Sequence, residues 1–106
     1  MDRELLKERF AEILGEEPLE VAELEVAGAK GYLVLSNSYE LTVRCNEWGR
    51  CEVMLRYMDQ PAVTCTTRCY KDPTSQLDRE LLSILEGKVR KLIEALNIQL
   101  LSLDDL

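Results

Sequence analysis

Three segments of alternating apolar and polar residues within 39–70 constrain the fold more than any other feature of the chain. They read YELTVRCN, RCEVMLRYM and AVTCTTRCY, and the short breaks EWG and DQP separate them. A period of two is typical of strands that bury one face, and Gly49 suits the left-handed position of a three-residue hairpin loop. We therefore expect a three-stranded antiparallel meander with hairpins centred on Trp48 and Gln60.

The expected register divides these side chains between two faces of the sheet. It places Cys45 opposite Cys51, and Cys51 opposite Cys69, on a buried face shared with aliphatic residues. The other face then carries Glu40, Thr42, Arg44, Glu52, Met54, Arg56, Thr64, Thr66 and Arg68. Three ion pairs are predicted on that face, namely Arg44–Glu52, Glu40–Arg56 and Glu52–Arg68. These pairs support the register independently of the turns.

Leucine-rich helices are expected before and after the meander. The first runs from Asp2 to about Leu14 and the second from about Asp72 to Leu96, each with apolar residues at helical spacing. The stripe of the second helix covers roughly half of its circumference, where one core contact needs about 100°. Two interpretations stay open: a homodimer through the C-terminal helix, or the first helix wrapped against it.

The remaining segments complete the expected fold. Residues 19–36 favour two more strands around a turn at 28–31, with Glu23 and Glu25 on the charged outer side of an edge-like strand. The leucine-rich tail 98–106 is a sixth strand, a packed extension or a short docking segment. We predict a single α+β domain over 1–106. It has an N-terminal helix, an antiparallel meander sheet of about five strands and a long C-terminal helix packed on one face.

Charge is unevenly distributed along the chain. The net charge is −7, and residues 1–27 hold nine acids and three bases. An acidic balance argues against nucleic-acid and membrane binding, and no apolar run approaches the roughly 20 residues of a membrane span. The charged N-terminus MDRELLKERF does not look like a secretory signal. We therefore expect a cytoplasmic protein with reduced thiols.

Four cysteines, spaced as Cys45-x5-Cys51 and Cys65-x3-Cys69, offer the most distinctive chemistry. We expect buried thiols that pack as small apolar groups. A disulfide between facing cysteines, Cys45–Cys51 or Cys51–Cys69, is the second interpretation. A metal-binding or redox module built on all four cysteines is the third interpretation. The cysteine spacing does not favour it, because structural zinc sites use tighter pairs whose ligands converge tetrahedrally. No metal or cofactor is therefore predicted.

Catalysis has little to build on in this sequence. The chain has no histidine, which excludes a Cys-His or Ser-His nucleophile pair and a histidine general base. A glycine-rich phosphate loop is also missing from the sequence. We predict a non-enzymatic, small acidic protein-interaction domain, such as an adaptor, a chaperone-like protein or an inhibitor. We expect it to bind a protein partner with a basic surface through its acidic N-terminal region, its hairpin tip or its C-terminal helix.

The candidate partner-binding residues fall into three groups: the acidic N-terminal region, the tryptophan at a hairpin tip, and the arginines of the polar sheet face. An exposed tryptophan is enriched at binding hot spots, and arginine recognises carboxylate or phosphate groups. The alternative for Trp48 is that its side chain folds back on a helix. A solvated face with cross-strand ion pairs is the simpler interpretation of the arginines. The full set is Glu16, Glu17, Glu20, Glu23, Glu25, Trp48, Arg44, Arg56 and Arg68.

Two helical motifs frame the sheet-forming region, LLKERFAEILG at 5–15 and LDRELLSILEGKVRKLIEAL at 77–96. In this frame the acidic chain resembles bacterial type III secretion chaperones. The resemblance implies an opening helix, a curved sheet, a closing helix and a chaperone-like function. That family places a helix between its third and fourth strands, where this sequence has only tight turns.

Overall fold

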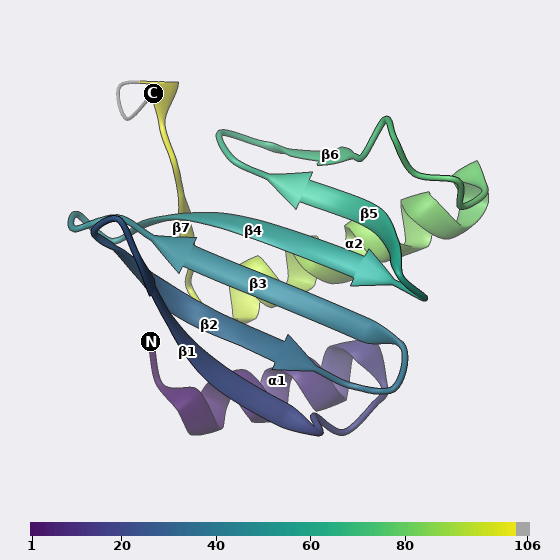
Figure 1. The fold of residues 1–106 in the computed structure, drawn as a ribbon. Coiled ribbons are helices and arrows are strands. Elements are labelled where there is room, and N and C mark those ends of the chain that lie inside the picture. Colours follow the sequence, from purple (N-terminus) through teal and green to yellow (C-terminus); the bar gives the residue numbers. More distant parts are fainter. Residues whose placement is uncertain (104–106) are drawn as a thin grey trace.

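The computed structural model describes residues 1–103 as two long helices and one sheet (Figure 1). Its elements are α1 (Arg3–Leu14), β1 (Glu20–Val26), β2 (Ala29–Leu35), β3 (Tyr39–Cys45), β4 (Arg50–Tyr57), β5 (Gln60–Cys65), β6 (Cys69–Lys71), α2 (Arg79–Ala95) and β7 (Gln99–Leu100). Strands β1 to β6 follow one another across the sheet, and β7 pairs with β4. The predicted α+β class with helices at both ends is confirmed, and the sheet has more strands than the five expected.

The first predicted hairpin has the predicted register. Cys45 lies opposite Cys51 across β3 and β4, and Gly49 takes the left-handed conformation with φ of 77°. The cross-strand ion pairs of this hairpin also form, Arg44 to Glu52 at 2.6 Å and Arg56 to Glu40 at 3.8 Å.

The second predicted hairpin is wrong in its turn and register. The turn is Met58-Asp59, with φ of 51° and 64°, so β4 and β5 close on a two-residue loop. A register irregularity between Leu55 and Arg56 then places Cys65 opposite Val53. Left-handed φ at both loop positions is the type I′ geometry that matches strand twist. The DQP motif concealed this turn, because proline looked like part of the loop.

The third predicted segment is two strands instead of one. The chain turns at 66–68, and Cys69 comes back opposite Cys65 to start β6. The predicted pairs Cys51–Cys69 and Glu52–Arg68 therefore do not form. The place beside the start of β4 is taken by β7, which sets Leu100 opposite Cys51 in a parallel pair. Part of the tail is thus a strand, and residues 104–106 lie outside the described part of the chain.

The first two strands form a hairpin whose turn is Ala27-Gly28, and its centre lies two residues before that of the turn expected at 28–31. Its register corrects the expected facing of β1. Glu23 lies opposite Tyr32, which lies opposite the buried Val43 of β3. Glu23 and Glu25 therefore project on the same side of the sheet as the core, and Leu24 projects on the other side.

The second helix begins later than the sequence suggested. The Oδ1 atom of Asp72 accepts hydrogen bonds from the Thr74 N–H at 2.9 Å and the Thr74 hydroxyl at 2.6 Å, which holds a turn. Such side-chain turns compete with helix formation. The cap of α2 is Asp78, whose carboxylate accepts from the Leu81 N–H at 2.8 Å, and the helix starts at Arg79.

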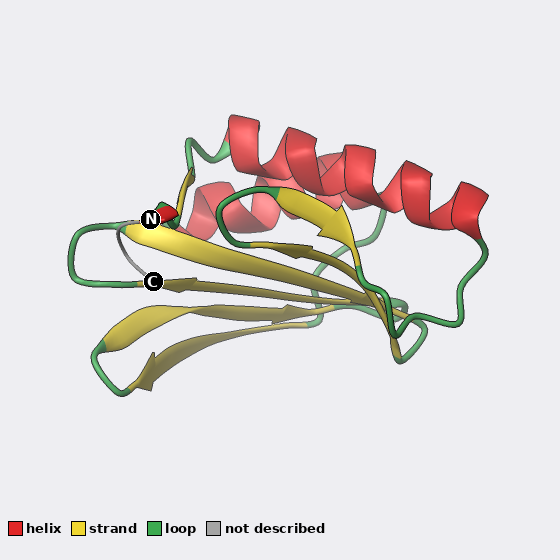
Figure 2. Cartoon of the chain, turned by 90° about the horizontal axis from the view of Figure 1, so that it is seen from above, coloured by secondary structure: helices red, strands yellow, loops and turns green. Residues whose placement is uncertain are grey.

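Both helices lie on the same side of the sheet (Figure 2), and the core lies between these layers. The ring of Phe10 from α1 meets Tyr39 of β3 edge-on at 6.5 Å. Helix α2 packs on β5, β6 and α1, and Lys88 Nζ donates to the Ile13 carbonyl at 3.2 Å. Helix α1 covers part of the apolar stripe of α2. Ile84, in the same stripe, is 53% exposed. The homodimer stays a prediction.

Candidate functional site at the Trp48 hairpin

All four cysteines are paired, as Cys45–Cys51 and Cys65–Cys69. The expectation of reduced thiols is therefore wrong, and one of the two alternative disulfides is present. The Asn46 N–H donates to the Arg50 carbonyl at 2.9 Å. The next pair outward, Cys45 and Cys51, thus occupies a non-hydrogen-bonded position, where facing side chains come closest.

The Cys65–Cys69 bridge was missed because its turn was not recognised in the sequence. The Thr66 N–H donates to the Arg68 carbonyl at 3.1 Å, which again leaves the adjacent cysteines at a close, non-hydrogen-bonded position. The Thr-Thr-Arg stretch has no glycine, proline or asparagine to announce a turn. The two disulfides do not favour the metal-binding alternative. Within residues 1–103, histidine, cysteine, aspartate and glutamate form no group of three suited to a metal ion.

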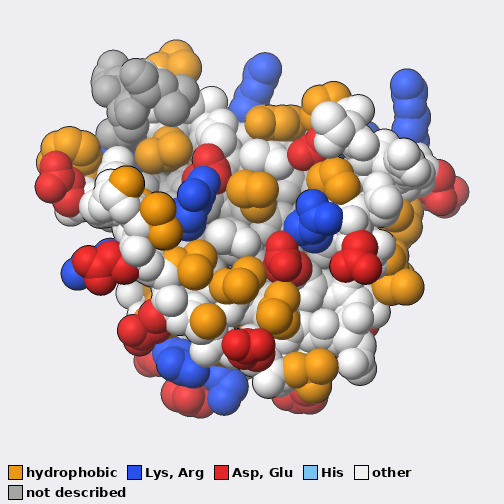
Figure 3. Space-filling view, viewed as in Figure 1, with side chains coloured by type: hydrophobic (Ala, Val, Ile, Leu, Met, Phe, Trp, Pro, Cys, Tyr) orange, Lys and Arg blue, Asp and Glu red, His pale blue; other side chains and the backbone are white. Residues whose placement is uncertain are grey.

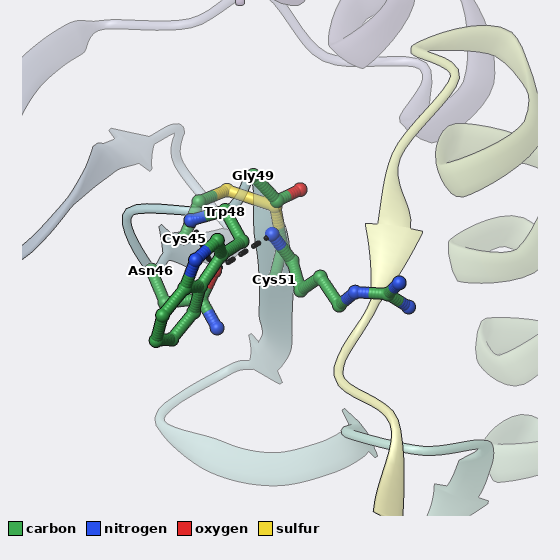
Figure 4. Close-up of a disulfide and its surroundings, with 6 residues drawn as sticks. Cys45, Asn46, Trp48, Gly49 and Cys51 are labelled. Atoms are coloured by element: carbon green, nitrogen blue, oxygen red, sulfur yellow. Dashed lines mark hydrogen bonds between the residues drawn. A yellow bond between two sulfur atoms is a disulfide. The ribbon is translucent and has the colours of Figure 1, made fainter. Parts of the chain in front are cut away.

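The loop between Cys45 and Cys51 is held by its own hydrogen bonds as well as by the disulfide (Figure 4). The Oδ1 atom of Asn46 accepts from the N–H groups of Trp48 and Arg50, each at 3.0 Å. The base of the loop is also attached to the chain after β7, because the Leu101 N–H donates to the Cys51 carbonyl at 3.0 Å. These contacts restrain the backbone of the loop.

Trp48 sits at that tip with 71% of its surface exposed, and it does not fold back on a helix. Several other large apolar side chains are also exposed. One of them is Val26 at the β1–β2 turn, which is 58% exposed. Figures 1 and 2 show the β1–β2 and β3–β4 turns at the same end of the sheet.

A groove of about 580 Å³ lies beside this hairpin. Its lining includes Glu23 and Glu25 from β1, Lys30 and Tyr32 from β2, and Cys45 of the disulfide. Glu25, Lys30 and Cys45 are successive partners across three strands, so the acidic edge and the Trp48 loop are about two strand spacings apart, or roughly 10 Å. The groove therefore joins them into one end surface.

The five predicted acidic residues separate into different roles. Glu16 accepts from the Ser36 hydroxyl at 2.7 Å and the Ser38 N–H at 2.9 Å. These hydrogen bonds, first that of Ser36, lower the pKa of the Glu16 carboxyl from its ordinary value. Glu16 thus fastens the turn between β2 and β3. Glu17 and Glu20 are exposed near that same turn, at the opposite end of β1 from Glu25.

The three predicted arginines are not gathered into one patch. Arg44 and Arg56 face acids on the open side of the sheet, and Arg56 also donates to the Asp59 carbonyl at 2.6 Å. Arg68 lies exposed in the turn between β5 and β6. Figure 3 looks onto this open face, where hydrophobic side chains are spread among separate basic and acidic ones. Mixed charge of this kind is typical of a solvated sheet face.

No protein-family model, curated protein or solved structure matches this chain. In the described residues, neither helix combines the length and apolar character needed to cross a membrane. Between β3 and β4, where the secretion chaperones place a helix, the chain has the Trp48 loop. The expected cytoplasmic location stays a prediction.

Proposed function

We propose that the chain is a non-enzymatic protein-interaction domain whose partner binds the end surface formed by the Trp48 hairpin and the acidic end of β1. The observation that carries the proposal is the 71% exposure of Trp48 on a loop closed by a disulfide. Exposing so large an apolar side chain to water is unfavourable. A loop fixed before binding loses little conformational entropy in the complex, which is the setting in which tryptophan becomes a hot spot.

Charge supports a partner with a basic surface. The protein has a net charge of −7, and Glu23 and Glu25 are exposed at the same end of the sheet as Trp48. Opposite charge on the partner raises the association rate and selects against acidic competitors. An adaptor, a chaperone-like protein and an inhibitor all use a surface of this type.

Selection of a phage-displayed library of random peptides against the protein tests this proposal. Bound peptides are expected to be rich in lysine and arginine. Trp48 is the only tryptophan, so its fluorescence reports directly whether a selected peptide covers it, through a blue shift of emission. Trp48→Ala should weaken binding by roughly 30-fold, the equivalent of a hot spot of about 2 kcal/mol.

The matched control is Ile84→Ala on the outer surface of α2. Ile84 is also a large exposed apolar residue, but it lies in the helix layer, away from the hairpin tip. This variant should bind the selected peptides as the unmodified protein does. Two results together would refute the proposed surface: selected peptides bind Trp48→Ala with unchanged affinity, and the same peptides leave the tryptophan emission of the unmodified protein unshifted.

A further inference from the structure

The outer edge of β1 is not covered by another strand among residues 1–103. There, β1 pairs with β2 on one side only. The Ala27-Gly28 turn closes on the pair Val26–Ala29, which exchanges its backbone hydrogen bonds as in other two-residue hairpins. This bonding alternates along a strand. The residue before Val26, and every second residue before that one, therefore direct their backbone N–H and C=O groups away from β2. In this chain these residues are Glu25, Glu23 and Val21.

The position of Arg3 supports this assignment. Its guanidinium donates to the Val21 carbonyl at 2.7 Å, which requires that carbonyl to point away from β2. Arg3 thereby covers the first part of the edge. Within residues 1–103, no strand or side chain pairs with the outward backbone groups of Glu23 and Glu25. The stretch near the β1–β2 turn is therefore open to an added strand.

Side chains on the two faces of β1 specify what such a strand would carry. Glu23 and Glu25 project on the side of the groove, and Leu24 and Val26 project on the opposite side. Cross-strand neighbours on one face interact most strongly when their charges are opposite or when both are apolar. A strand added to this edge therefore fits best with basic residues beside the glutamates and apolar residues beside Leu24 and Val26. The groove of about 580 Å³ gives long basic side chains room.

We propose that the free edge of β1 binds an extended segment of a partner protein in which Lys or Arg alternates with apolar residues. The segment adds a strand to the sheet through the backbone groups of Glu23 and Glu25. This inference rests on the proposed function and names the class of partner. The β1 edge of a second copy of the chain would fit this edge poorly. Antiparallel pairing of two β1 edges brings the glutamates of the two copies opposite or next to each other, where like charges repel.

The direct test uses three synthetic peptides with blocked termini: one alternating Val and Lys, one alternating Val and Glu, and one with the Val and Lys residues in a non-alternating order. Titration calorimetry should show binding of the first alone. Amide hydrogen exchange should slow at Glu23 and Glu25 in the complex, and stay unchanged at Leu24, whose N–H already bonds to β2.

Two variants at one position separate backbone pairing from charge. Glu23→Pro removes an outward N–H without touching the ladder to β2, as proline on an edge strand allows. Glu23→Gln keeps the N–H and removes the charge. The proline variant should lose binding by at least about tenfold and the glutamine variant by only a few-fold. Circular dichroism checks that both variants fold.

Reversal of the edge charge supplies the decisive result. The variant Glu23→Lys/Glu25→Lys should prefer the Val and Glu peptide over the Val and Lys peptide. Equal binding of the alternating and non-alternating lysine peptides, or full binding by Glu23→Pro, would overturn strand addition. Glutamates that only protect the edge against any added strand would leave all three peptides unbound, which overturns it as well. The proposed function is refuted by a different result, namely that peptides selected from the random library bind Trp48→Ala as tightly as the unmodified protein.

Discussion

Reduction of the disulfides should destabilise the protein by an amount that the loop lengths set. Cys45 and Cys51 are separated by 6 positions, so the bridge closes seven residues, and Cys65–Cys69, with a separation of 4, closes five. The loss of loop entropy from the unfolded chain is then about 2.3 kcal/mol for the first bridge and about 2.1 kcal/mol for the second. Together they approach the lower end of the roughly 5–15 kcal/mol that stabilises a domain.

Urea unfolding of the oxidised and the reduced protein, followed by circular dichroism, measures this difference without any amino-acid substitution. The double variant Cys45→Ala/Cys51→Ala isolates the first bridge, and its melting temperature should fall by about 10 °C or more. Alkylation in denaturant without a reductant, read by mass spectrometry, should find no reactive thiol. Four alkylated thiols, or the same urea midpoint before and after reduction, would refute this reasoning.

Three further perturbations test the fold locally. Gly31→Ala should lower the free energy of unfolding in urea by about 2 kcal/mol or more, because the new Cβ would lie 1.7 Å from the Val43 carbonyl oxygen. Gly87→Ala, whose new Cβ would have nothing within 4 Å, should instead stabilise α2 by up to about 1 kcal/mol. Equal effects of the two variants would contradict the close approach of Gly31 to β3. Asp78→Ala should cost about 1 kcal/mol by removing the cap of α2, and an unchanged midpoint would show the cap to be dispensable. The carboxyl of Glu16 has a pKa below its ordinary value of 4.5 in the folded protein, so its stabilisation is present above about pH 4.5 and is lost as the pH falls through the folded pKa. The stability difference between the protein and Glu16→Gln should therefore shrink as the pH falls below about 4.5, and a constant difference would argue against the charged hydrogen bonds.

The first hairpin could be predicted because two independent signals agreed. Gly49 fixed the turn, and the pairs formed by Arg44 and Arg56 with acids fixed the register. The second hairpin had no such agreement. Left-handed φ at Met58 is unusual for that residue type, so no local preference announced the two-residue turn. A shift in that turn then misplaced every residue of β5.

The sequence indicated the position of Trp48 at a hairpin tip, but it did not indicate how the acidic residues are grouped around it. Trp48 at a hairpin tip followed from the register, and its exposure agrees with that position. The separation of Glu16 from Glu23 and Glu25 did not follow, because it depends on contacts with Ser36 and Ser38 far along the chain. Likewise, the sequence left the register of 19–36 open, and that register decides which face of β1 carries the charge.

The disulfides connect the stability of this sheet to the presentation of its surface. Two strands on the side of the sheet away from β1 are short, since β6 spans Cys69–Lys71 and β7 spans Gln99–Leu100. Strands of two or three residues contribute few ladder hydrogen bonds. One bridge fixes β6 to β5, and the other fixes the base of the Trp48 loop where β7 joins β4. Covalent closure at these two places restrains turns that the ladder alone would hold weakly. The backbone that carries the exposed Trp48 is therefore restrained on a small sheet, which is the property that the proposed partner surface requires.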